Sequence, residues 1–261
     1  MNDKFTRIGF ILAVAGSAVG LGNAWKFPTL VGQNGGSAFI LLYLLLTFLV
    51  SFVLFIGEIC IGRIGESDPV DSYRRLAPKH KEAWSKAGFL MITALLIYSF
   101  YSVVMGWILK YTITSAFSLP NDIAQSGEMF SALLKDSPAV AIACFSVMSL
   151  VCFYIVSRGI KSGIERLNVW MMPALFILLM LMVAYSTSFD GFSKSAKFLL
   201  VPDFSALNSK SVLEALGLAF FTLSLGVTTI TTYAASLPER TNILTSSINI
   251  VLINVLIGIM M

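Results

Sequence analysis

The sequence predicts an all-α membrane protein whose helices cross the lipid bilayer several times. Hydrophobic residues make up 57% of the 261 residues and charged residues only 12%, whereas a typical soluble domain carries about 25% charge. The only charged residues inside its apolar stretches are Lys26, Glu58, Lys110 and Glu214. Seven of these stretches reach the roughly 20 residues that a spanning helix needs, and they cover residues 8–33, 39–61, 87–119, 139–157, 167–189, 212–237 and 243–261.

The basic residues predict how these spans are oriented. Of the 18 Lys and Arg residues, twelve fall in the N-terminal tail and in the loops after the second, fourth and sixth spans, and four fall in the other loops. Because short loops rich in Lys and Arg face the cytoplasm, we expect a cytoplasmic N-terminus and a multi-pass protein of the cell (inner) membrane. The net charge of +4 then reflects topology, so no nucleic-acid partner is expected.

The first span is the least regular of the seven. Its segment 15–28 holds three glycines, followed by Asn23 and Pro28; in a helix Gly costs about 1 kcal/mol and Pro about 3 kcal/mol relative to Ala. Backbone groups freed in lipid cost several kcal/mol unless something binds them, and transporters bind ions and substrates at such breaks. We therefore expect the centre of a sodium-coupled solute site here. A cleavable signal peptide is the alternative, but the apolar run continues through Phe27 and six more spans follow.

Glu58 is the notable residue of the second span. A carboxylate about one turn inside the membrane is costly and usually has a partner. We expect that partner to be backbone amides of another broken helix; the alternative is a side chain that reaches water at the interface. Lys110, near one end of the third span, can reach the interface with its long side chain. The three cysteines fall inside spans, without the spacing of a metal site or a disulfide.

The sixth span repeats the pattern of the first. Residues 220–229 place one Gly, one Ser and three Thr at mid-depth, which suits either close helix packing or a second unwound segment. Two interrupted spans at matching places in successive five-helix units indicate an inverted-repeat transporter. The seventh span adds Asn249 and Asn254.

Five stretches, in order, resemble the neurotransmitter:sodium symporter family, which contains the bacterial leucine transporter. They are residues 15–28, 34–36, 57–63, 158–166 and 220–226. The resemblance implies a five-plus-five inverted-repeat fold of which only the first repeat and the first two helices of the second are present. Members of the family have more spans than this chain, so we expect it to be truncated after the seventh.

The same resemblance divides the chain into three parts. Residues 1–189 would form the first five-helix repeat, with its first helix broken at 18–23. Residues 190–211 would form an extracellular loop. Residues 212–261 would start the second repeat, with a break near 223–228 and a partial seventh helix.

The resemblance also implies the members of two sodium sites and one substrate site. The first sodium site would take oxygens of Ala18, Asn23, Thr222 and Asn254, and the substrate carboxylate would complete it. A second site would be partial, with Gly16 and Val19. Lys26 would belong to a gate, and Glu58 would have a gate or structural role. The substrate site would be lined by Ala18, Gly20, Leu21, Gly22, Ile97, Tyr101, Phe221, Thr222, Ser224 and Val227.

Two positions bear on the substrate. Amine transporters of the family have Asp where this chain has Gly20, and that Asp replaces the carboxylate their substrates lack. An amino acid, which brings its own carboxylate, is therefore the expected substrate. Val227 stands where the leucine transporter has Phe, so we expect a pocket for a bulkier side chain.

Other positions depart from the family pattern. Lys26 replaces the outer-gate Arg, keeping the charge but losing the bidentate fork, and Lys4 replaces a Trp near the inner gate. Tyr43 of the family's chloride site is present, but Leu218 replaces its Gln, and Gly258 stands where a Ser or an acid is expected. We therefore expect Na⁺ as the coupling ion, and neither chloride dependence nor a carboxylate that substitutes for chloride.

Three other classes of protein compete with the symporter. A truncated, non-transporting membrane fragment of such a symporter is the main alternative. A seven-helix receptor is disfavoured because its N-terminus would lie on the opposite side of the membrane. An enzyme is not expected, because Ser, His and Asp never converge within the spans. The sodium count, the identity of the amino acid and a homodimeric state stay open.

Overall fold

The structure, a computed structural model, describes residues 5–20, 22–238 and 241–261. The chain divides into two compact units. The first comprises Met1–Met91 and Ile160–Met261, and the second comprises Ile92–Gly159. The described residues are almost entirely helical, as predicted. Five helical stretches are long and apolar enough to cross a membrane: Ser37–Gly65, Lys81–Ser115, Pro138–Ser157, Ile160–Ser186 and Ile243–Met260.

The first span is bent rather than straight. Helix α1 (Arg7–Ala18) ends where Val19 turns to an extended conformation, and a π-helical turn, η1 (Gly22–Lys26), leads into α2 (Phe27–Gln33). The two halves are inclined by 47° and together are long enough to span. Pro28 lies in the first turn of α2, directly after the π-helical turn.

The segment that the sequence predicts as the sixth span is also interrupted. It consists of α12 (Ser209–Thr222) and α13 (Thr229–Ala235). Between them Ser224, Gly226 and Thr228 adopt left-handed backbone conformations, with φ of 53°, 77° and 59°. This conformation is free of steric cost only for Gly, so the two hydroxyl residues are held there by the surrounding structure.

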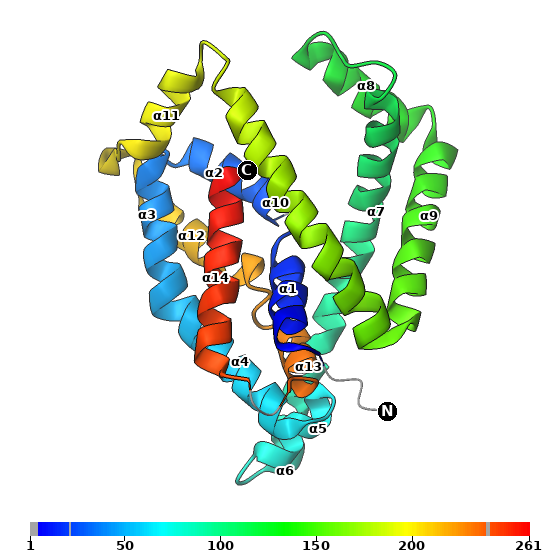
Figure 1. The fold of residues 1–261 in the computed structure, drawn as a ribbon, viewed down its shortest axis with the longest axis vertical. Helices are drawn as coiled ribbons and strands as arrows, with labels where there is room; N and C mark the ends of the chain where they lie inside the picture. The colour runs from blue at the N-terminus through cyan, green and yellow to red at the C-terminus, as the bar shows by residue number, and fades with distance from the viewer. Residues whose placement is uncertain (1–4, 21, 239–240) are drawn as a thin grey trace. The chain divides into compact units, whose positions relative to one another are not determined.

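The remaining helices complete the first unit. The second span consists of α3 (Ser37–Leu46), the π-helical turn η2 (Thr47–Ser51) and α4 (Phe52–Gly65). The turn η4 (Ile160–Glu165) continues as α10 (Arg166–Ser186), and α14 (Ile243–Met260) closes the chain. Helix α1 contacts α10 and α14, and α14 runs beside it in Figure 1. The fully buried side chains at the centre of this unit include Phe10, Val14, Phe39, Phe55, Ile59, Leu223 and Ile250.

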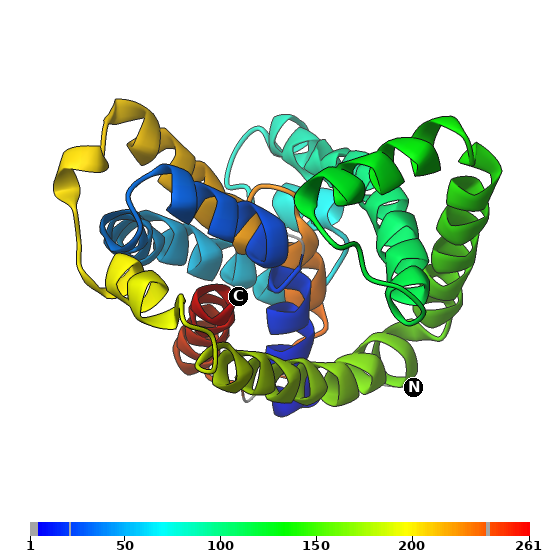
Figure 2. The same cartoon turned by 90° about the horizontal axis from the view of Figure 1, so that it is seen from above.

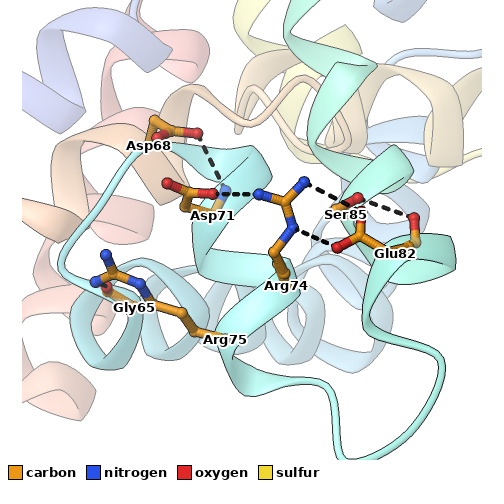
Figure 3. Close-up of polar contacts among 7 residues, drawn as sticks. All are labelled: Gly65, Asp68, Asp71, Arg74, Arg75, Glu82 and Ser85. Carbon is orange, nitrogen blue, oxygen red and sulfur yellow. Dashed lines mark hydrogen bonds and ion pairs between the residues drawn. The ribbon is translucent and has the colours of Figure 1, made fainter.

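Short helices connect the second and third spans. They are α5 (Pro69–Leu76), α6 (Lys81–Ser85) and the 3₁₀ turn η3 (Lys86–Leu90). Arg74 forms ion pairs of 2.9 Å with Asp71 and 3.1 Å with Glu82 (Figure 3). Asp71 and Arg74 are partly exposed and Glu82 is largely exposed, so each pair contributes at most about 1 kcal/mol.

The segment 190–211 was expected to be a loop, and the structure shows more order in it. It contains α11 (Phe192–Leu200) and a 3₁₀ turn, η5 (Phe204–Ala206). Asp203 begins that turn and accepts hydrogen bonds from the backbone N and the hydroxyl of Ser205, which lower the pKa of its carboxyl group. Both helices are too short to be recognised from apolar periodicity.

The second unit is built from α7 (Met91–Ser115), α8 (Ile123–Lys135) and α9 (Pro138–Ser157). Helices α7 and α9 run side by side in both views (Figures 1 and 2). Gly106 allows this approach, since a Cβ there would lie 2.8 Å from the backbone N of Phe145. Lys110 donates to Thr114 Oγ1 at 3.0 Å, so its ammonium group has a partner on its own helix.

Candidate ion and substrate site

Two buried asparagines meet at the interruption of the first span. Asn23 Nδ2 donates to Asn254 Oδ1 at 2.8 Å and to the carbonyl of the same residue at 3.3 Å. The two side chains are 1% and 0% exposed. Asn23 Oδ1 and Asn254 Nδ2 are buried without a hydrogen-bond partner. An unsatisfied buried polar atom costs about 1–3 kcal/mol, so this arrangement favours a ligand that Oδ1 can bind.

The end of α12 lies against the same turn. A Cβ at Gly22 would lie 2.9 Å from the Phe221 ring and 3.6 Å from Thr222 Cγ2. Thr222 is 1% exposed, and its hydroxyl oxygen lies 3.1 Å from the Tyr43 hydroxyl oxygen. The structure therefore brings residues of the first, second, sixth and seventh spans to one place: Gly22, Asn23, Tyr43, Phe221, Thr222 and Asn254.

The other predicted site residues are placed as follows. Ala18 and Val19 are buried at the end of α1. The Gly20 carbonyl accepts from the backbone N of Asn23 at 3.0 Å and of Ala24 at 3.2 Å. Leu21 lies outside the described residues. Gly16, Ser224 and Val227 are half-buried in the first unit, whereas Ile97 and Tyr101 lie on α7 and belong to the second unit.

Glu58 accepts a hydrogen bond from the interrupted segment between α12 and α13. Its Oε1 accepts from the backbone N of Gly226 at 2.7 Å, so the prediction that a backbone amide of another broken helix binds this carboxylate is confirmed. Its Oε2 is buried without a hydrogen-bond partner. Burial of the Tyr73 ring, on α5, and the nearby charge of Glu58 raise the pKa of that phenol.

The residues at the gate and chloride positions are Lys26, Leu218 and Gly258. Lys26 is exposed, and no carboxylate of the described residues pairs with it. Leu218 is 3% exposed and packs in the apolar core. A Cβ at Gly258 would make ordinary contacts, 3.8 Å from Asn23 Nδ2 and from the Phe27 ring. Within the described part of the chain, no three His, Cys, Asp or Glu side chains come together as a metal site would need.

Two polar networks were not predicted from the sequence. Asn34 donates to Glu214 Oε2 at 2.9 Å and accepts from Ser211 Oγ at 2.6 Å, which joins α2 to α12. Thr6, which begins α1, donates to Glu165. These residues are far apart in the sequence, so the only available signal was that a charged residue in or beside an apolar span needs a partner.

Known proteins resemble this chain over nearly its whole length. The model of the sodium:neurotransmitter symporter family matches residues 3–125 and 134–261. The fold and this match define the class of protein, an all-helical membrane protein of the symporter type. The chain belongs to the sodium:neurotransmitter symporter family, as the sequence predicted.

Individual relatives are consistent with that assignment. An uncharacterized sodium-dependent transporter of Bacillus subtilis, YhdH, is 41% identical over 258 residues, which cover 98% of this chain and 56% of that protein. An uncharacterized sodium-dependent transporter of Methanocaldococcus jannaschii is 33% identical over 261 residues, 95% of this chain and 52% of that protein. The chain spans about half the length of these curated relatives.

A solved structure is also similar. The crystal structure of MhsT in complex with L-phenylalanine superposes with a TM-score of 0.86 and 36% sequence identity. The match covers 99% of this chain and 60% of that one. This similarity confirms the predicted fold class, and the names of the curated relatives support Na⁺ as the coupling ion.

Proposed function

We propose that this chain takes part in sodium-coupled symport of an amino acid into the cell by alternating access. The observation that carries the proposal is the Asn23 side chain, whose Oδ1 is buried without a partner at the interruption of a spanning helix. The orientation that follows from the basic loops puts the N-terminus in the cytoplasm of a cell (inner) membrane.

The first sodium site would use neutral oxygen donors from both interrupted spans. These are the Ala18 carbonyl, the Asn23 and Asn254 amide oxygens, and the carbonyl and hydroxyl of Thr222. At present Asn23 turns its Nδ2 toward Asn254. Rotation of the Asn23 amide group would turn Oδ1 toward the same place, so that two amide oxygens face one ion.

The substrate would supply the negative charge that this set of donors lacks. Its carboxylate would complete the sodium shell and accept from the amides of Leu21 and Gly22 and from the Tyr101 hydroxyl. The ammonium group would face the carbonyls of Ala18, Phe221 and Thr222 and the Ser224 hydroxyl. This shared carboxylate would couple ion binding to substrate binding, because neither ligand alone satisfies the site.

The substrate side chain should be large. Gly20 would leave room for the substrate carboxylate, Val227 is smaller than the Phe of the leucine transporter, and the family resemblance adds Ile97 to the lining residues. The structure of MhsT, similar to this chain, was determined with L-phenylalanine. Gly16 and Val19 would contribute backbone carbonyls to a second sodium site. Leu218 and Gly258 offer no anion ligand, so we expect transport to be independent of chloride.

Binding and uptake by the reconstituted chain test this proposal. We expect phenylalanine to bind in NaCl and in sodium gluconate alike, and not in choline chloride. Replacing Asn254 by Leu should abolish binding, whereas Asn249→Leu on the same helix should preserve it. Binding that does not need sodium would contradict the proposal.

The alternative, a membrane piece that does not transport, is favoured by the share of its relatives' length that the chain spans. Uptake into sealed vesicles under a sodium gradient separates the two functions. Sodium-dependent binding without uptake would assign the chain to the alternative.

A further inference from the structure

The start of α1 is fastened by a buried carboxylate. Glu165, the last residue of η4, is 7% exposed. Its Oε2 accepts from the backbone N of Thr6 at 3.2 Å, and its Oε1 accepts from the Thr6 hydroxyl at 2.6 Å. The Thr6 hydroxyl in turn accepts from the backbone N of Gly9 at 2.9 Å. One carboxylate thus binds both donors of the residue that caps α1, at the positive end of that helix.

Helix α1 and the η4–α10 segment are in close contact. A Cβ at Gly9 would lie 2.1 Å from the Glu165 carboxyl group. Two turns along α1, a Cβ at Gly16 would lie 1.9 Å from Oδ1 of Asn168, whose Nδ2 donates to the Ile164 carbonyl. Two polar side chains from the η4–α10 segment therefore rest directly on glycines of one face of α1.

A second contact fixes the residue before the cap. The backbone N of Phe5 donates to the Ser236 carbonyl at 3.1 Å, just beyond α13. The Phe5 ring is 2% exposed and meets Tyr233 and Phe10 edge to face, with centroids 5.8 and 5.9 Å apart. The start of α1 is thus held on one side by a backbone hydrogen bond and apolar contacts, and on the other by hydrogen bonds to one charged group.

These contacts matter because α1 is separate from the rest of its span. It ends at Ala18, and the continuation is inclined by 47°, so α1 and α2 are two separate helices. Gly16, Ala18 and Val19, whose carbonyls serve the proposed ion sites, lie at the far end of α1. Fastening its beginning therefore fixes the position of those carbonyls.

We propose that Glu165 is a positioning residue that acts through Thr6 as the latch of α1. With the pair closed, the carbonyls of α1 stay at the proposed ion sites and the buried face of α1 stays covered on the side of the N-terminus. Breaking the pair frees α1 to leave its place on η4 and α10. This inference rests on the proposed function, in which that side is the cytoplasmic one.

The test is the rate at which a thiol on the buried face of α1 becomes accessible. Ala13, 1% exposed, is changed to Cys in a chain whose Cys60, Cys144 and Cys152 are changed to Ala. The full chain is reconstituted, and a membrane-impermeant maleimide is applied from the side of the N-terminus. We expect Glu165→Gln and Thr6→Val each to raise the labelling rate about tenfold, the change that loss of one hydrogen bond to a charged group corresponds to.

Matched variants distinguish loss of the contact between Glu165 and Thr6 from a general destabilisation of the protein. Thr6→Ser keeps the hydroxyl and should label as slowly as the parent, and so should Glu82→Gln, which removes an exposed carboxylate from α6. The double variant of Thr6→Val and Glu165→Gln should label no faster than either single one. Unchanged labelling in both single variants, additive effects in the double variant, or fast labelling of Thr6→Ser would each overturn the inference. Because labelling needs no transport, its outcome is independent of whether the chain takes up an amino acid.

Discussion

Asn23 donates a hydrogen bond from Nδ2 to Oδ1 of Asn254, 231 positions later in the chain, and both side chains are buried. The bond leaves one atom of each amide without a partner. It therefore holds the interrupted first span against the seventh span, while Asn23 Oδ1 stays available as an acceptor.

Sodium should stabilise the protein through Asn23. A ligand at 100 times its dissociation constant adds about 2.7 kcal/mol to the free energy of unfolding, so Na⁺ with phenylalanine should raise the melting temperature relative to choline. In Asn23→Leu this increase should vanish. Thermal melting followed by tryptophan fluorescence measures it, with Asn249→Leu as the control. An increase that persists in Asn23→Leu would show that the ion binds elsewhere.

Gly20 should determine which class of substrate binds. An Asp at this position would occupy the place of the substrate carboxylate and repel it, so Gly20→Asp should abolish amino-acid binding and favour amines such as phenethylamine. Competition binding in NaCl measures both. Gly32→Asp, where an added Cβ meets nothing within 4 Å, is the control for a new charge on the same span. Undiminished amino-acid binding by Gly20→Asp would sink this prediction.

The pocket beside Val227 should set the size of the substrate side chain. Val227→Phe fills space, so it should weaken binding of phenylalanine more than binding of alanine. A change of one methylene in such a pocket is worth about 1–3 kcal/mol, which predicts at least a tenfold shift in the ratio of the two affinities. Val227→Ala should leave that ratio in favour of phenylalanine. Equal losses for both amino acids in Val227→Phe would place Val227 outside the pocket.

Glu58 and Gly226 should contribute to stability as a pair. Glu58→Ala leaves the amide of Gly226 without its acceptor, which should lower the free energy of unfolding by about 1–3 kcal/mol. Gly226→Ala should cost about 1–2 kcal/mol because φ is 77° there. Glu58→Gln keeps an acceptor oxygen and should be milder than Glu58→Ala. Melting temperatures of the three variants in detergent give the order, which an equal loss for Gln and Ala would contradict.

Much of this architecture follows from local sequence, and some of it does not. The break after Ala18 is visible in the sequence because glycines and Pro28 oppose a continuous helix, and the demand of a buried carboxylate for a partner pointed from Glu58 to an amide of another broken helix. The contacts of Asn34 with Glu214 and of Thr6 with Glu165 depend on which helices pack together. No single-residue preference encodes that packing. The short α11 escaped prediction because its length is below that of a recognisable apolar repeat.

The hydrogen bond between Glu58 and Gly226 has a consequence for a different atom. In an uninterrupted helix, the N–H of Gly226 would donate to the carbonyl of Thr222, four residues earlier. Here that N–H is supplied with a carboxylate oxygen from the second span instead. The carboxylate thus replaces the Thr222 carbonyl as the acceptor for this N–H. One acidic side chain in α4 thereby leaves the carbonyl oxygen at the end of α12 available to a cation.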